Sequence, residues 1–172
     1  TISTNITLNP GINRIIVQTF DDPNDIGNEV ECGDIDIWYD MPGSTVPNPL
    51  TAPNTVLNAA SGPWYINNNL TIPADKTLTI EPGATVFFNR GKNLTVNGRL
   101  VAVGSKYQHI RMALDPEAGG SPSQHWNGIS FSNTSQDNRL CYVDMEYADN
   151  GTQAIYVNNS RLLIDNMTWP NT

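Results

Sequence analysis

Apolar residues recur in pairs along residues 64–172, each pair at positions i and i+2 and separated from the next by turn residues. An alternation with a period of two is typical of short β-strands. The pairs return after about 22–26 residues, which gives three strands per repeat and is the pattern of one coil of a parallel β-helix. The recurring pairs are Leu70 and Ile72 with Leu94 and Val96, Leu78 and Ile80 with Leu100 and Ala102, Val86 and Phe88 with Ile110 and Met112, Ile129 and Phe131 with Ile155 and Val157, and Met145 and Tyr147 with Met167 and Trp169.

These repeats predict an all-β chain in which residues 64–172 form a right-handed parallel β-helix of about four coils. A long loop from Ala113 to Trp126, which contains Gly and Pro, interrupts the repeat. The last coil is incomplete and ends without a polar cap. Because an uncapped coil exposes its backbone edge, we expect an open C-terminal end that further coils continue, in the same protein or in a separate chain.

Residues 1–40 show a different pattern, in which strand-like runs alternate with polar turns. The runs are Asn5–Leu8, Arg14–Phe20 and Asp34–Tyr39. They predict a hairpin preceded by one more strand, as part of a β-sandwich.

Residues 41–63 are predicted to be a Pro-rich linker between these two parts. Proline fixes φ and lacks a hydrogen-bond donor, so the stretch should be extended and without a ladder of its own. The apolar residues Val46, Leu50, Val56 and Leu57 indicate that it lies against a domain.

The repeats also carry a resemblance to known families. The segments LTIEPGATVFF (78–88), LTVNGRLVAVGS (94–105) and WNGISF (126–131) resemble the right-handed parallel β-helix of the pectate-lyase-like superfamily. Residues 1–40, with their NPG turn and the run IDIWYD, resemble the last strands of an immunoglobulin-like or fibronectin-type sandwich, which needs about seven strands. The order of the two parts is similar to that in large secreted bacterial surface proteins.

The charge and the hydropathy of the chain exclude two kinds of partner. The 172 residues carry 9 Lys and Arg against 17 Asp and Glu, a net charge of −8, which disfavours nucleic-acid binding. No apolar run is long enough to span a membrane. Cys32 and Cys141 are interpreted as two small buried thiols, although a disulfide between them stays open at this point.

Asp144 and Glu146 are the candidate catalytic residues. They lie at i and i+2, so both carboxylates share the outer face of a strand if Met145 points inward. Paired carboxylates can bind a cation or act on a glycosidic bond. The preferred interpretation is nevertheless an ordinary solvated strand face, because alternation alone produces such pairs.

The candidate metal site lies in the polar loop between the last two runs of residues 1–40. Asp21, Asp22, Asn24 and Asp25 supply hard oxygen atoms of the kind that Ca²⁺ prefers, with Asn28 and Glu29 close by. The spacing does not match an EF-hand, and Asp and Asn are also common in hairpin loops. Calcium is therefore a possible cofactor, and no other is expected.

Asp115, His125 and Trp126 form the candidate ligand-binding set. An acid, an imidazole and an exposed indole at the end of the long loop would suit a sugar, and we expect Trp126 to be exposed. We expect Trp169 to lie in the core and Trp64 to cover the open end of the first coil. Asn69 and Asn93 repeat with the coil, and such asparagines are expected to stack along its axis.

Three functions remain open. The first is a non-catalytic structural or adhesive segment of an extracellular or cell-surface protein. In its adhesive form, this segment would bind polysaccharide. The alternatives are part of a polysaccharide-active lyase or glycoside hydrolase, since the resembling superfamily contains enzymes and non-enzymes alike, and a subunit of a larger extracellular assembly. The expected partners are the remaining domains of a parent protein or the chains that complete the sandwich.

Overall fold

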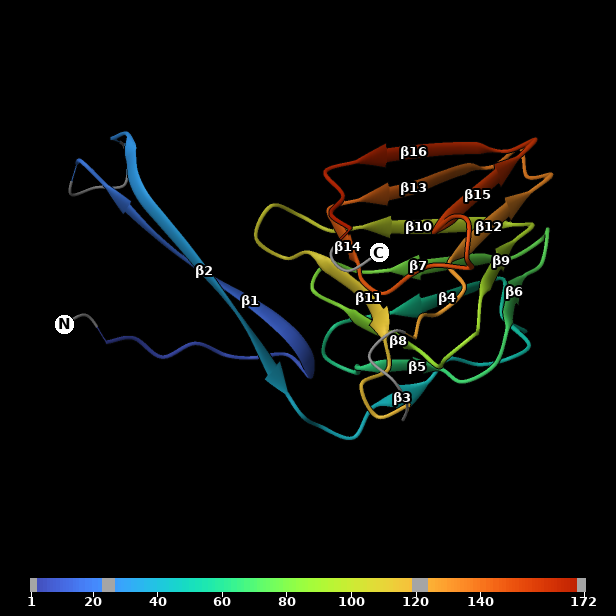
Figure 1. Cartoon of the computed structure of the whole chain (residues 1–172), viewed down its shortest axis with the longest axis horizontal. Helices are drawn as coiled ribbons and strands as arrows, with labels where there is room; N and C mark the ends of the chain where they lie inside the picture. The colour runs from blue at the N-terminus through green and yellow to red at the C-terminus, as the bar shows by residue number, and fades with distance from the viewer. Residues whose placement is uncertain (1–2, 23–26, 119–123, 170–172) are drawn as a thin grey trace.

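The computed structural model describes residues 3–22, 27–118 and 124–169, and these ranges contain strands and no helix. An antiparallel hairpin projects from a solenoid of stacked parallel strands (Figure 1). The solenoid has three parallel sheets of five, five and four strands, and therefore about five turns. The predicted all-β parallel fold is confirmed. The described residues include no helix long and apolar enough to cross a membrane.

Each turn of the solenoid contributes one strand to each sheet, except that the first turn contributes none to sheet three. Sheet one contains, in spatial order, β16 (Arg161–Asp165), β13 (Asp137–Cys141), β10 (Arg99–Val103), β7 (Thr77–Ile80) and β4 (Asn54–Leu57). Sheet two contains β14 (Val143–Met145), β11 (Ile110–Leu114), β8 (Thr85–Phe88), β5 (Trp64–Ile66) and β3 (Ser44–Thr45). Sheet three contains β15 (Ile155–Asn158), β12 (Ile129–Ser132), β9 (Leu94–Val96) and β6 (Leu70–Ile72).

The predicted register holds in sheets one and three. Leu70 pairs with Leu94, Leu78 with Leu100, and Ile129 with Ile155. These side chains belong to one continuous apolar core that fills the inside of the solenoid. Side chains from successive turns therefore stack in columns, as the repeat predicted.

The predicted register in sheet two is wrong by two residues. Val86 pairs with Met112 and not with Ile110. The cause is the turn between β10 and β11, where Ser105 and Gln108 form a small antiparallel bridge that lengthens this winding. Because a shift of two residues keeps the same face inward, all three of these apolar side chains are still fully buried.

The last turn departs from the predicted register in the same way. The bridge in sheet two joins Asp144 to Thr168. Met145 is therefore not level with Met167, as the repeat had indicated.

The Pro-rich segment is not a linker without a ladder. Its strands β3 and β4 pair in parallel with β5 and β7, so the segment forms the first turn, which adds to the four coils that were predicted. Its packing was predicted correctly for Val46, Leu50 and Leu57, which are at most 3% exposed. These side chains close the N-terminal end of the core.

The hairpin consists of β1 (Gly11–Phe20) and β2 (Glu29–Tyr39), with Ile15 opposite Ile35. Residues 5–8 are not a strand, so the strand that was predicted to precede the hairpin is wrong. The described residues of the N-terminal part form a two-stranded sheet and no sandwich. A hairpin of this kind is marginally stable alone in water and needs a surface to pack on.

Candidate functional site

Sheet two is covered by protein on both faces. In sheets one and three, burial alternates along the strands, as in β7 and β12. In β8 every residue is buried, and in β14 as well. The outer face of sheet two is buried because the base of the hairpin lies on it.

Two contacts attach the hairpin to β8. The amide of Ile12 donates a hydrogen bond to Thr85 Oγ1 at 2.9 Å. The ring of Trp38 meets Phe87 edge-on, with 6.3 Å between the ring centroids. Since Phe87 points outward from the solenoid yet is only 2% exposed, the hairpin shields an apolar outer surface.

Arg111 on β11 links three carboxylates from two parts of the chain. Its Nη1 donates to Asp144 Oδ2 at 2.8 Å, and its Nη2 donates to Asp36 Oδ2 at 2.9 Å. Nη2 also donates to Glu146 Oε1. One guanidinium therefore joins β11 and the acid pair of the fifth turn to β2 of the hairpin.

Asp144 is the centre of the network and is fully buried. Besides Arg111, it accepts a hydrogen bond from Thr168 Oγ1 at 2.5 Å and contacts His109 Nδ1 at 3.0 Å. Arg14 of β1 lies 3.4 Å away and holds Asp36 with two further hydrogen bonds. We name this network the junction cluster; it comprises Arg14, Asp36, His109, Arg111, Asp144, Glu146 and Thr168.

The two acids of the fifth turn have pKa values shifted in opposite directions. Burial opposes the ionisation of Asp144, but hydrogen bonds from Thr168 and His109 and the charge of Arg111 outweigh it and lower its pKa. Burial dominates at Glu146, where the nearby charges of Asp36 and Asp144 add to it, and the pKa is raised despite Arg111. The pKa of Asp36 is lowered, since hydrogen bonds and charge from Arg14 and Arg111 outweigh its partial burial.

Asp144 and Glu146 do share the outer face of their strand, but the predicted solvated face is wrong. The Asp144 side chain has no exposure and that of Glu146 has 14%. The sequence contained a signal that pointed here. Val86, Phe87 and Phe88 show no alternation, which is typical of a strand covered on both faces.

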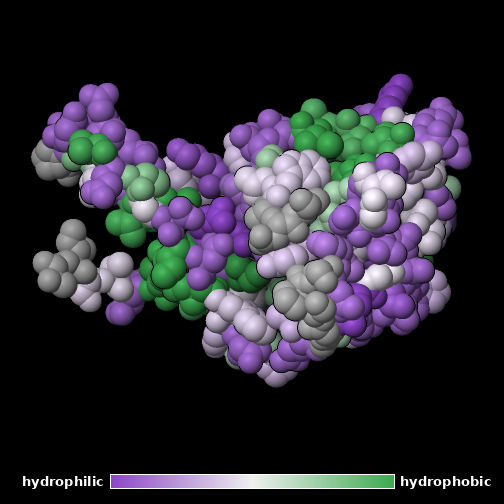
Figure 2. Space-filling model, viewed as in Figure 1, coloured by the Kyte–Doolittle hydropathy of each residue, from purple (hydrophilic) through white to green (hydrophobic). Residues whose placement is uncertain are grey.

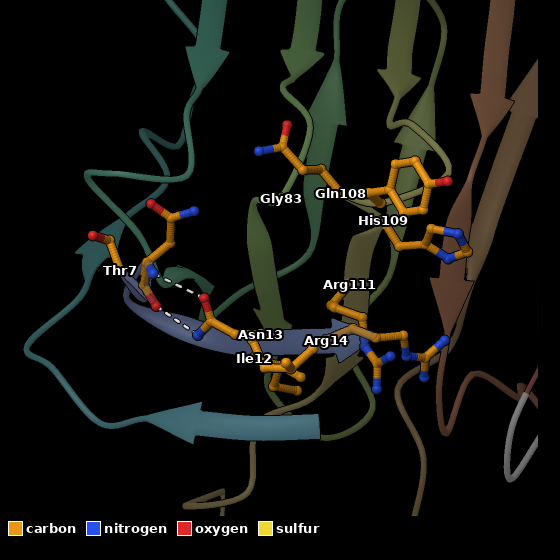
Figure 3. A pocket seen from close by; sticks show the side chains of 11 residues that line it. Thr7, Ile12, Asn13, Arg14, Gly83, Gln108, His109 and Arg111 are labelled. Carbon is orange, nitrogen blue, oxygen red and sulfur yellow. Dashed lines mark hydrogen bonds between the residues drawn. The ribbon is translucent and has the colours of Figure 1, made fainter. Parts of the chain in front are cut away.

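A small polar pocket lies beside the junction cluster, between the start of β1 and the turn before β11 (Figure 3). Its volume is about 140 Å³. Asn13, Gln108 and His109 are among the residues that line it. The Asn13 amide is already used, because it bonds Asn9 and Gly11. The pocket is smaller than the sites of about 300–1,000 Å³ that hold most organic ligands.

The predicted calcium loop lies only partly within the described residues, because Asn24 and Asp25 fall outside them. Asp21 accepts hydrogen bonds from the Asn28 amide at 2.7 Å and from its side chain at 3.2 Å. No group of three or more His, Cys, Asp or Glu that could hold a metal occurs in the described ranges. Calcium at this loop stays a prediction.

Trp126 is buried, so the prediction that this indole is exposed is wrong, while its place in a sugar-binding set stays a prediction. It is 0% exposed and stacks on Phe88 with 3.8 Å between the ring centroids. Its Nε1 donates to the Glu146 carbonyl at 2.8 Å. The indole fills the core between sheets two and three and satisfies its polar atom there.

The other two members of the predicted ligand set are held locally. Asp115 accepts a hydrogen bond from the Glu117 amide at 2.9 Å, and the ring of His125 lies 6.4 Å from that of Tyr147. Within the described ranges, no hydrogen bond, ion pair or ring contact joins Asp115, His125 and Trp126 into one site.

The remaining side-chain predictions have mixed outcomes. Trp169 is 42% exposed and not core, and Trp64 lies in the second turn, where its Nε1 bonds the Asn58 carbonyl. Both cysteines are free, and Cys32 is exposed rather than buried. The expected side-chain stacking of Asn69 and Asn93 is not confirmed, because Asn69 Oδ1 accepts a hydrogen bond from the backbone amide of Asn93 at 3.3 Å while Asn93 Oδ1 has no hydrogen-bond partner among the described residues.

Acid should weaken the junction cluster through Asp144 and Asp36. Each has a folded pKa below its unfolded value, so its contribution is present above about pH 3.9 and is lost as the pH falls through the folded value. The raised pKa of Glu146 acts in the opposite sense, because its protonation removes the cost of a buried charge. We expect the free energy of unfolding to rise slightly as Glu146 takes up its proton and to fall once the pH drops below about 4.

Urea unfolding of the wild type, Asp144→Asn and Glu146→Gln across this range checks the expectation. The fall in unfolding free energy at low pH should be smaller in Asp144→Asn. The slight rise in unfolding free energy before that fall should vanish in Glu146→Gln. Parallel profiles for all three proteins would contradict the assignment of the pH dependence to these carboxyls.

Comparisons of the chain with protein-family models, with curated proteins and with solved structures give no match.

Proposed function

We propose that this chain is a rigid, non-catalytic structural or adhesive module in which the solenoid serves as a spacer and the hairpin as a fixed arm. The observation that carries the proposal is the engagement of the acid pair. Asp144 and Glu146, the strongest catalytic candidates, bind Arg111, which also binds Asp36 of the arm. The chemistry of the cluster is therefore used to hold two parts of the chain together.

Access to substrate gives the second argument. A glycosidase needs two carboxyl groups on either side of a sugar, one of them free to donate a proton. Here Asp144 has no exposed surface, and the hairpin base lies over the outer face of its sheet. The neighbouring pocket of about 140 Å³ has no room for an oligosaccharide.

The location and the partners belong to the same proposal. The resemblance of the repeats to pectate-lyase-like β-helices and the scarcity of charged side chains, 15% of the chain, support an extracellular or cell-surface protein, with polysaccharide as a ligand of an exposed flank. The apolar outer face of the hairpin, with Val17 at 63% and Ile35 at 59% exposure, supports a neighbouring domain or chain as its partner.

The test compares stability with activity in one pair of variants. For the module proposed here, Asp144→Asn and Glu146→Gln should change the unfolding transition, and the wild type should cleave no acidic or neutral glycan in a panel followed by reducing-end and unsaturated-product assays. Turnover by the wild type that is lost in Glu146→Gln at unchanged stability would overturn the proposal.

A polysaccharide-active enzyme is the second candidate. One observation favours it: a pair of neighbouring carboxyls whose pKa values are pushed apart is the pattern of an acid and a base. The same glycan panel tests this candidate, and a bell-shaped pH profile that collapses in both variants would support it.

A further inference from the structure

The two ends of the solenoid differ in how completely their apolar core side chains are covered. At the N-terminal end, Leu57 is fully buried. At the other end, Val157 lies next to the buried Phe131 of the preceding turn but is itself 45% exposed. In the same way, Ile164 lies next to the buried Leu140 but is 44% exposed. Figure 2 shows apolar side chains gathered over β16. The open end is therefore an apolar surface bordered by the edge of a sheet.

The backbone of β16 presents unpaired groups along this edge. The strand pairs with β13 alone among the described strands. The Arg161 amide donates to Thr134, and the Asp165 carbonyl accepts from Tyr142, so odd-numbered residues direct their backbone groups towards the preceding turn. Since these directions alternate along a strand, Leu162 and Ile164 direct theirs to the open edge.

The side chains of β16 are complementary to themselves when the strand is reversed. The sequence reads Arg161, Leu162, Leu163, Ile164, Asp165. In an antiparallel pair of two copies centred on Leu163, each Arg161 lies directly opposite Asp165 of the second copy, and each Leu162 lies opposite Ile164. Opposite charges across such a pair are stabilising. No Lys or Pro, the residues that usually protect an edge, occurs in the strand.

We propose that the open end of the solenoid binds a second copy of this chain, through antiparallel pairing of β16 with β16 about a two-fold axis at Leu163. Leu162 and Ile164 face each other as the hydrogen-bonded pairs, and the two open cores cover one another. Such an interface is isologous and closes as a dimer. The N-terminal end is less suited to stacking on this surface, because its apolar side chains Val46 and Leu50 are each only 3% exposed.

Charge variants test the self-complementarity. The wild-type chain should have twice its 18.9 kDa mass in sedimentation equilibrium. Arg161→Glu and Asp165→Arg should each weaken the dimer by about tenfold or more, because each places like charges opposite one another twice. An equimolar mixture of the two variants should regain the wild-type affinity, since every pair across the axis is then opposite in charge.

Cross-linking tests the register. At the axis, the two Leu163 residues form a non-hydrogen-bonded pair with Cα atoms about 4.5 Å apart, a distance that a disulfide can span. In a Cys32→Ser background, Leu163→Cys should form a disulfide-linked dimer on mild oxidation. Arg139→Cys is the matched control and should not, because Arg139 lies beside Leu163 on β13, one strand further from the axis.

Circular dichroism and the unfolding midpoint establish that each variant folds as the wild type does. A wild type that stays monomeric at the highest concentration reached would overturn the proposal. Failure of the mixed charge variants to associate, or equal cross-linking of Arg139→Cys and Leu163→Cys, would overturn it as well.

Discussion

Replacing Asp144 with alanine should lower the free energy of unfolding by about 3–5 kcal/mol. The side chain is fully buried and has Arg111, His109 and Thr168 as partners. Its removal leaves Arg111 Nη1, His109 and Thr168 without the acceptor that they share, in a place that water does not reach. The guanidinium, itself 7% exposed, then keeps only Asp36 and Glu146 as carboxylate partners. Breaking one ion pair of a buried network and leaving its donors without an acceptor is strongly destabilising.

Equilibrium urea unfolding measures this loss, and Asp75→Ala is the matched control. Asp75 also has an ion-pair partner, Lys76 at 3.0 Å, but its side chain is 72% exposed. An exposed ion pair contributes little, so the control should unfold like the wild type. Equal losses of unfolding free energy in both variants would show that the burial of Asp144 is not the reason that its removal destabilises the fold.

Replacing Trp126 with alanine should cost about 3–5 kcal/mol, because it leaves a cavity that the stacked Phe88 ring cannot fill. Trp126→Phe should cost about 1–3 kcal/mol, since it keeps an aromatic ring but leaves the Glu146 carbonyl without its donor. Trp169→Ala is the control for loss of an indole and should cost about 1 kcal/mol or less, because that side chain is 42% exposed.

The measurement is chemical denaturation, with glycan binding followed in parallel. Binding should decline only to the extent that the protein unfolds. A Trp126→Ala protein that is as stable as the wild type, yet has lost glycan binding, would contradict the assignment of this indole to the core.

The sequence predicts the inside of the solenoid well because inward positions are decided locally. Leu78 and Ile80 alternate with polar residues, and a strand with one buried face requires that alternation. Register is less local. The bridge between Ser105 and Gln108 lengthens one winding by two residues, and apolar periodicity does not distinguish Ile110 from Met112 as the partner of Val86.

The junction cluster could not be predicted for a different reason. It depends on where the hairpin lies, and no repeat encodes that position. Arg111 occupies an outward position like many exposed polar residues of the coil, and only the docked β2 brings Asp36 within 2.9 Å of it. The lack of alternation around Phe87 indicates a covered face, but it does not identify the segment that covers it.

During synthesis on the ribosome, the hairpin arm can dock only after the solenoid turns that it contacts have been made. The arm is synthesised before the solenoid, but its binding surface consists of Phe87, Arg111 and Asp144, which come from the third, fourth and fifth turns. Until those windings have emerged and stacked, the arm has no surface to rest on. Nascent chains should therefore acquire the full resistance of the arm to proteolysis only when translation has passed the fifth winding.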